Sequence, residues 1–137
     1  MEKNTNKIKS ILKNSKTIAI VGISKDKNKD SNICGAYLKY KGYNIIPVNP
    51  NAENILGIPA IKSLENINKK VDIVDVFRPS SEAEEITKAA IKIGAKVVWL
   101  QVGITNKNAE KLAEKNNILF VSNRCLAKEH KYLRYHY

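Results

Sequence analysis

The stretch T-I-A-I-V-G at Thr17–Gly22 decides the fold of this chain, because an uncharged run of strand-forming residues ends abruptly at a glycine. A strand that is apolar on both faces is typical of a parallel sheet with helices on each side. After a polar loop, Asp30 or Ser31 is placed to cap a helix that extends to about Lys41 and ends at Gly42. The residues that we expect to face the core from this helix are Ile33, Ala36, Tyr37 and Tyr40.

Strand and helix patterns alternate through the rest of the chain. Further strands are predicted at Tyr43–Val48, Val71–Phe77, Lys96–Gln101 and Ile118–Val121. Further helices are predicted between Pro79 and Gly94, over Asn106–Lys115 and over about Leu126–Leu133, after an N-terminal helical extension over residues 1–16. This alternation predicts an α/β fold, a Rossmann-like doubly wound sheet of about five parallel strands with helices on both faces. Numbered along the chain, the strands are expected in the order 3-2-1-4-5, within a single domain over residues 1–137.

The formal net charge of +11 raises the question of a nucleic-acid partner. Lysine, asparagine and isoleucine are all abundant, arginine is scarce, and the lysines are scattered through every segment. That distribution is typical of a compositionally biased genome, and no nucleic-acid recognition motif accompanies the charge. We therefore expect no nucleic-acid partner, although the charge favours a polyanionic small molecule as the ligand.

Membrane, secreted and metal-binding classes find no support in the sequence. It contains no run of about eighteen apolar residues, so no membrane span is expected. Residues 1–16 are rich in Lys and Asn and lack the apolar stretch of a secretory signal, which predicts a cytoplasmic location. Cys34 and Cys125 are too few for a disulfide scaffold and lack metal-ligand spacing, and no catalytic motif is present. We expect neither a metal nor an enzyme, and the sequence leaves open whether two chains form a homodimer.

The loop after the first strand predicts a phosphate site. In an open parallel sheet the ligand lies beyond the carboxyl ends of the strands. Gly22 permits a tight turn there, but Ile23 and Ser24 follow where a NAD fingerprint has its second glycine, so a pyrophosphate cannot approach the backbone as it does in a NAD site. Lys25 and the start of the helix at Ser31 supply positive charge and free amides instead.

The end of the second strand carries Asn49-Pro50, and the residues found there disfavour NAD. NAD-binding proteins place an acidic side chain at this position to accept hydrogen bonds from the adenosine ribose. A carboxylate would repel a phosphate on that ribose, so its absence favours a nucleotide such as coenzyme A, which carries a 3′-phosphate. The 2′-phosphate of NADP explains the missing acid equally well, so an NAD(P)-binding redox or sensor protein is the alternative.

Two other strand ends supply further candidates. Phe77-Arg78-Pro79 puts an aromatic ring and a guanidinium where they can contact an adenine or a phosphate, although Phe77 also suits the core. Gln101 can present an amide to the same ligand. Cys125 follows the fifth strand, which allows a thiol-based redox regulator that forms a mixed disulfide with coenzyme A.

Several motifs in order resemble those of the stand-alone CoA-binding proteins, which are similar to the N-terminal CoA-binding domain of the succinyl-CoA synthetase alpha subunit. The motifs are I-A-I-V-G-I-S-K (18–25), G-Y-N-I-I-P-V-N-P (42–50), L-G-I-P-A-I-K-S-L (56–64), V-D-I-V-D-V-F-R (71–78), G-A-K-V-V-W-L-Q-V-G-I (94–104) and N-R-C-L-A-K-E-H (123–130). The resemblance implies a Rossmann-like fold that binds CoA or an acyl-CoA across the C-terminal strand ends. It implies no catalysis, since the phosphorylated histidine of the synthetase belongs to a second domain.

The resemblance also assigns roles to residues and shows two departures. It implies phosphates at Gly22, Ser24 and Lys25, adenosine near Asn49 and Pro50, and a cleft lined by Phe77, Arg78 and Pro79. Pro79 stands where the family usually has a second basic residue, which weakens the expected phosphate affinity. Asn123 stands where the family usually has aspartate, which changes the charge next to Cys125.

Overall fold

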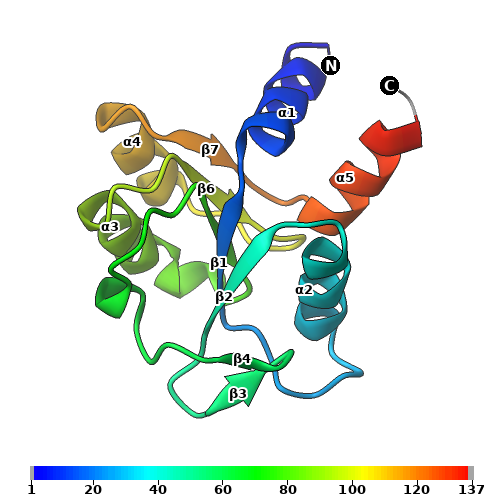
Figure 1. Ribbon diagram of the computed structural model, residues 1–137. Coiled ribbons are helices and arrows are strands. Elements are labelled where there is room, and N and C mark those ends of the chain that lie inside the picture. The colour runs from blue at the N-terminus through cyan, green and yellow to red at the C-terminus, as the bar shows by residue number, and fades with distance from the viewer. Residues whose placement is uncertain (1, 136–137) are drawn as a thin grey trace.

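Five parallel strands form the central sheet of the computed structural model, which describes residues 2–135, and helices cover both faces (Figure 1). The strands of the sheet are β1 (Thr17–Val21), β2 (Asn44–Val48), β5 (Ile73–Val76), β6 (Val97–Leu100) and β7 (Leu119–Val121). A small antiparallel ribbon, formed by β3 (Asn54–Ile55) and β4 (Ile58–Pro59), lies outside the sheet. The predicted fold class, a Rossmann-like α/β sheet of parallel strands, is confirmed.

The helices divide between the two faces of the sheet. The bounds are α1 (Glu2–Asn14), α2 (Asp30–Tyr40), α3 (Ala83–Lys92), α4 (Lys107–Lys115) and α5 (Leu126–Tyr135), with short 3-10 turns η1 (Leu64–Asn66) and η2 (Ser80–Glu82). Helices α1, α2 and α5 pack on the face that carries Ile18 and Ile20, whereas α3 and α4 pack on the face that carries Ala19. Successive residues of one strand therefore serve opposite cores, which explains why β1 is apolar throughout.

The predicted strand order, 3-2-1-4-5, is wrong. The observed order is β2-β1-β5-β6-β7, so the third long strand pairs with the first and β2 lies at the edge of the sheet. An edge suits β2, since Pro47 has no N–H to donate to a second neighbour. On its outer side β2 is bridged by Ile61, whose N–H donates to the Pro47 carbonyl at 2.8 Å. Every residue of β5 is buried, as a central strand requires.

The side of α2 that was predicted to face the core is wrong except at Tyr37, which is half-buried and packs against the core. Ile33 is 53% exposed and Tyr40 is 84% exposed, whereas Leu38 is fully buried. The side of α2 that carries Gly35 and Leu38 faces the core instead, because Gly35 lies against Ile23. A Cβ added at Gly35 would come within 2.7 Å of the Ile23 Cδ1. No side chain caps α2: its N-cap residue is Lys29, and neither Asp30 nor Ser31 fills that role.

Two aspartates of the β5 segment have opposite environments. The Asp72 carboxylate accepts backbone N–H bonds from Lys16 and Thr17 at 2.8 and 3.0 Å and so holds the start of β5 beside β1. Burial acts to raise the pKa of Asp72, but these bonds and Lys96 lower it overall. Asp75 is fully buried, accepts one bond from the Gln101 amide, and leaves its Oδ2 without a partner among the described residues. Burial raises the pKa of Asp75 to about 8.

We predict that Asp75→Asn removes a fall in stability that the wild-type protein shows between about pH 4 and pH 8. The unfolded state ionises near pH 3.9, while the folded state keeps its proton until about pH 8, so the free energy of unfolding falls as the pH rises through this window. The full effect is at most about 6 kcal/mol at 1.36 kcal/mol per pKa unit. Urea unfolding of both proteins at several pH values measures it.

Asp72→Asn is the matched control, because the pKa of Asp72 is lowered and its effect has the opposite sign. This variant should lose stability relative to the wild type above about pH 5 and approach it at lower pH. Parallel pH profiles for the wild type and Asp75→Asn would contradict a buried, protonated Asp75.

Candidate functional site

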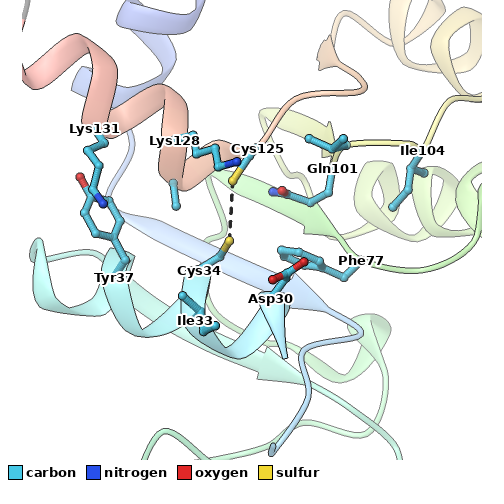
Figure 2. Close-up of a pocket in the computed structure, with 12 residues that line it drawn as sticks. Asp30, Ile33, Cys34, Tyr37, Phe77, Gln101, Ile104, Cys125, Lys128 and Lys131 are labelled. Carbon is cyan, nitrogen blue, oxygen red and sulfur yellow. Dashed lines mark hydrogen bonds between the residues drawn. The ribbon is translucent and has the colours of Figure 1, made fainter. Parts of the chain in front are cut away.

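Several cavities lie along the edge where the strands end, and two of them contain predicted site residues. The β2-side cavity, about 430 Å³, is lined by Gly22, Asn49, Pro50, Lys62 and Arg78, together with side chains from α3. The α2–α5 cavity, about 460 Å³, is lined mainly by residues of α2, α5 and the ends of β5 and β6 (Figure 2). Of the predicted site residues, Gly22, Asn49, Pro50 and Arg78 line the β2-side cavity, and Phe77 and Gln101 line the α2–α5 cavity. The others line neither cavity: Ile23, Ser24, Lys25, Ser31 and Pro79.

Gly22 joins the ends of three strands. Its φ is +89°, a conformation that favours glycine, and its N–H donates to the Val48 carbonyl at 3.0 Å. An added Cβ would lie 2.8 Å from the Arg78 Cδ and 3.0 Å from the Phe77 carbonyl oxygen. The next residue, Ile23, is fully buried, so only its backbone can contribute to a site.

The loop after β1 is held by polar side chains from both sides. The Ser24 N–H donates to the Ser31 hydroxyl at 2.9 Å, and the Asn32 amide donates to the Ser24 carbonyl at 2.8 Å. From the β2 end, the Asn49 amide donates to the Ile23 carbonyl at 2.9 Å. Ser31 and Asn49 therefore position the loop, while Lys25 is exposed at its tip. The sequence predicts a role for the backbone amides at Ser31 and Asn32 but not for the Asn32 side chain, which lies on the buried side of the helix.

The β2-side cavity is lined by two cations, Lys62 and Arg78, and by two acids, Glu82 and Glu85. Lys62 lies there with its Nζ 3.1 Å from the Pro50 carbonyl, a residue that the sequence analysis did not select. Arg78 forms a two-pronged bond with Glu82 at 2.7 and 3.1 Å, and this bond lowers the pKa of Glu82. Both side chains are nearly half exposed, so the pair adds little stability and leaves the guanidinium able to exchange partners.

The α2–α5 cavity contains the second set of predicted residues and the two cysteines. Phe77 and Gln101 line it, and both approach from the strand ends. Gln101 is buried and donates its amide to Asp75. Cys34 on α2 faces Cys125 at the start of α5, and their sulfur atoms are 3.7 Å apart (Figure 2).

The thiols of this pair differ in acidity. The pKa of the Cys125 thiol is lowered to about 6, mainly because Cys34 forms a hydrogen bond with it. The backbone N–H groups of Lys128 and Ala127 also hydrogen-bond to the thiol and lower its pKa, whereas burial acts to raise it. The pKa of Cys34 is raised by its hydrogen bond with Cys125 and by burial. His130 lies on the same helix with its Nδ1 bonded to the Tyr37 hydroxyl at 2.7 Å, and burial lowers its pKa.

The two departures from the expected family pattern have local explanations. Asn123 has a φ of +58°, and its Oδ1 accepts the Gly103 N–H at 2.7 Å. An aspartate would accept the same bond, so asparagine preserves the contact and removes one negative charge beside Cys125. Pro79 precedes η2 with a φ of −53°, the value that its ring enforces, and lines neither cavity.

Other kinds of site find no support in the described residues. Nowhere in residues 2–135 do three or more His, Cys, Asp or Glu side chains gather as a metal site would require. No helix in that part of the chain is both long and apolar enough to cross a membrane. His136, one of the two histidines, lies outside the described residues.

Comparison with known proteins identifies the family. The model of the CoA binding domain matches residues 16–131. The uncharacterised protein YneT of Bacillus subtilis is 34% identical over 123 residues, which cover 90% of this chain and 91% of YneT. The ADP-forming acetate–CoA ligase of Methanocaldococcus jannaschii is 30% identical over 121 residues, which cover 81% of this chain and 17% of the ligase.

A solved structure extends the match to the whole fold. A hypothetical protein from Pyrococcus horikoshii OT3 is 39% identical, with a TM-score of 0.92 over 95% of this chain and 92% of that one. The resemblance to the CoA-binding proteins that the sequence indicated is thus confirmed. Since the family match spans far more than half of its length, this chain belongs to the CoA-binding domain family.

Proposed function

We propose that this protein binds coenzyme A or an acyl-CoA along the carboxyl ends of β1, β2 and β5, without catalysis of its own. The observation that carries the proposal is the uncharged end of β2 beside a cavity that contains Lys62 and Arg78. Family membership supports the ligand class. The ribose and its 3′-phosphate would occupy the β2-side cavity.

The end of β2 favours a phosphorylated ribose for two reasons. Asn49 carries no charge, so it does not repel a phosphate as the aspartate of a NAD site would. Its amide is also already engaged, because the nitrogen donates to Ile23 and the oxygen accepts from the Asn51 N–H at 2.8 Å. The cation nearest to this strand end is Lys62, a compact charge suited to a phosphate.

The diphosphate would lie over the loop after β1. The start of α2 has no side-chain cap, so its first amides remain available to an anion, and the helix dipole favours negative charge there. Lys25 adds a cation at the exposed tip of the same loop. Buried Ile23 lets the loop backbone lie flat against the sheet, where a phosphate can lie over it.

The pantetheine arm would then pass Phe77 and enter the α2–α5 cavity. The apolar side chains there, Ile33, Phe77, Val102 and Ile104, suit a chain that carries few charges. Ile33 and Val102 are 53% and 66% exposed, and a bound arm would cover them. The thiol or acyl end of the ligand would lie in the cavity that contains Cys125.

An NADP-binding redox or sensor protein is the second candidate. The missing acid at the end of β2 admits a 2′-phosphate as readily as a 3′-phosphate. Against NADP, the loop after β1 has a single glycine where the dinucleotide fingerprint has three, and family membership supports CoA. A CoA-binding protein should bind CoA more tightly than NADPH, and an NADP-binding protein should show the reverse.

Titration calorimetry with CoA, dephospho-CoA and NADPH tests the proposal. We predict that CoA binds about tenfold more tightly than dephospho-CoA, a difference of about 1.4 kcal/mol. The difference should shrink as salt is added, because it depends on exposed charges. Equal affinities for CoA and dephospho-CoA, or tight binding of NADPH alone, would reject the assignment.

The role of the strand end is tested by comparing Asn49→Asp with Asn49→Ala. Both variants lose the bond from the Asn49 amide to Ile23, but only the aspartate adds a negative charge beside the ribose. We predict that Asn49→Asp binds CoA at least tenfold more weakly than Asn49→Ala, while the two bind dephospho-CoA alike. If both variants lose the same affinity for both ligands, Asn49 acts only by positioning the loop.

A further inference from the structure

The two cysteines of the chain are 91 positions apart and meet at the wall of the α2–α5 cavity. The Cys34 and Cys125 sulfur atoms are 3.7 Å apart, and both residues line the cavity (Figure 2). A disulfide bond is about 2.05 Å long, so the sulfur atoms need to approach each other by only about 1.6 Å. Both thiols are free in this structure.

The two thiols are arranged asymmetrically. Cys125 is partly exposed at the start of α5 and accepts N–H bonds from Lys128 and Ala127, which stabilise a thiolate. Cys34 is only 8% exposed, and its pKa is raised, so it keeps its proton. A partly exposed thiolate that faces a buried thiol is the arrangement of an attacking and a resolving cysteine.

The surrounding charges favour a thiolate on Cys125 and a protonated thiol on Cys34. Lys128 and Lys131 of α5 line the cavity, and Lys128 helps to lower the pKa of Cys125. Asp75 on β5 is close enough for the thiolate to raise its pKa. When Asp75 is protonated it is neutral, so its Oδ2, which has no partner among the described residues, carries no buried negative charge. Asp30 on α2 lines the cavity, and Asp75 and Asp30 both act to raise the pKa of Cys34, in addition to its bond with Cys125 and its burial.

We propose that Cys125 and Cys34 form a redox pair that reduces a low-molecular-weight disulfide entering the α2–α5 cavity. The preferred oxidant is CoA disulfide, a preference that rests on the proposed function. The reaction is stoichiometric, and a reduced thiol pair is consumed in each event.

The exchange takes place in two steps. The Cys125 thiolate attacks one sulfur of the disulfide RSSR, forms a Cys125–S–S–R bond and releases RS⁻, which takes up a proton. Cys34 then loses its proton to solvent or to a neighbouring base and attacks the Cys125 sulfur. This forms the Cys34–Cys125 disulfide and releases the second RS⁻. In total, two protein thiols are oxidised and one RSSR is reduced to two RSH.

The test is to incubate the reduced protein with CoA disulfide, trap free thiols with N-ethylmaleimide at successive times, and map the cysteines by mass spectrometry. In the wild type we expect a transient CoA adduct on Cys125 that converts to a Cys34–Cys125 disulfide. In Cys34→Ala the adduct should persist, because nothing resolves it. In Cys125→Ala, Cys34 should remain reduced over the same period.

Several results would overturn the pair. A wild-type adduct as persistent as that of Cys34→Ala would show that Cys34 does not resolve it. Modification of Cys34 in Cys125→Ala at the wild-type rate would show that Cys125 is not the attacking thiol. Circular dichroism checks that both variants fold, and the wild-type time course alone decides the matter if either does not.

A second oxidant separates this inference from the proposed function. Hydroxyethyl disulfide has no nucleotide, so it probes the thiol chemistry alone. We expect both oxidants to yield the Cys34–Cys125 disulfide, with CoA disulfide reacting at least tenfold faster at equal concentration. Equal rates would support the redox pair and count against nucleotide recognition. Failure of both oxidants, with CoA binding intact by calorimetry, would reject the redox pair and leave the proposed function standing.

Discussion

The close contact of three strand ends at Gly22 is the constraint on which the rest of the site depends. The Gly22 N–H reaches Val48 on β2, and its Cα lies against Phe77 and Arg78 beyond β5, so any side chain at this position would push the strand ends apart. Gly22 and Arg78 line the β2-side cavity and Phe77 lines the α2–α5 cavity, so this contact contributes residues to both cavities. The same glycine that permits the turn therefore also shapes the surface on which a nucleotide would lie.

Polar side chains, together with the buried side chain of Ile23, fix the loop that leaves this contact. Ser31, Asn32 and Asn49 each bond to the backbone between Ile23 and Ser24, and two of these three side chains come from the first turn of α2. These bonds explain why Ser31 and Asn32 are buried at the start of α2, where the sequence predicted a helix cap. A loop held by such bonds needs little rearrangement when it meets an anion, so less of the binding free energy is lost to ordering.

The sequence predicts the strands and helices well and the side-chain contacts poorly, for reasons that particular residues show. Apolar runs such as Thr17–Val21 identify strands because both faces of the sheet are covered. Strand order depends on which strand edges pair, and in this sequence a single residue bears on it: Pro47, which lacks an N–H, indicates that its strand lies at the edge of the sheet. The inward side of α2 depends on one contact, Gly35 against Ile23, which hydrophobic periodicity does not register. Lys62 and the meeting of Cys34 with Cys125 depend on tertiary structure, since nothing local in the sequence links residues so far apart.

The electrostatics of the α2–α5 cavity connect its proposed chemistry to the stability of the core. Asp75 and the Cys125 thiolate disfavour each other's charge, and each is a potential anion in a region with little water. Because such coupling is reciprocal, removing the thiolate by disulfide formation would lower the pKa of Asp75. Burial is nevertheless the first cause of the raised pKa of Asp75, so the carboxyl would remain harder to ionise than an exposed one in either redox state. The core thus tolerates a reactive thiolate at its surface because the nearest buried acid keeps its proton.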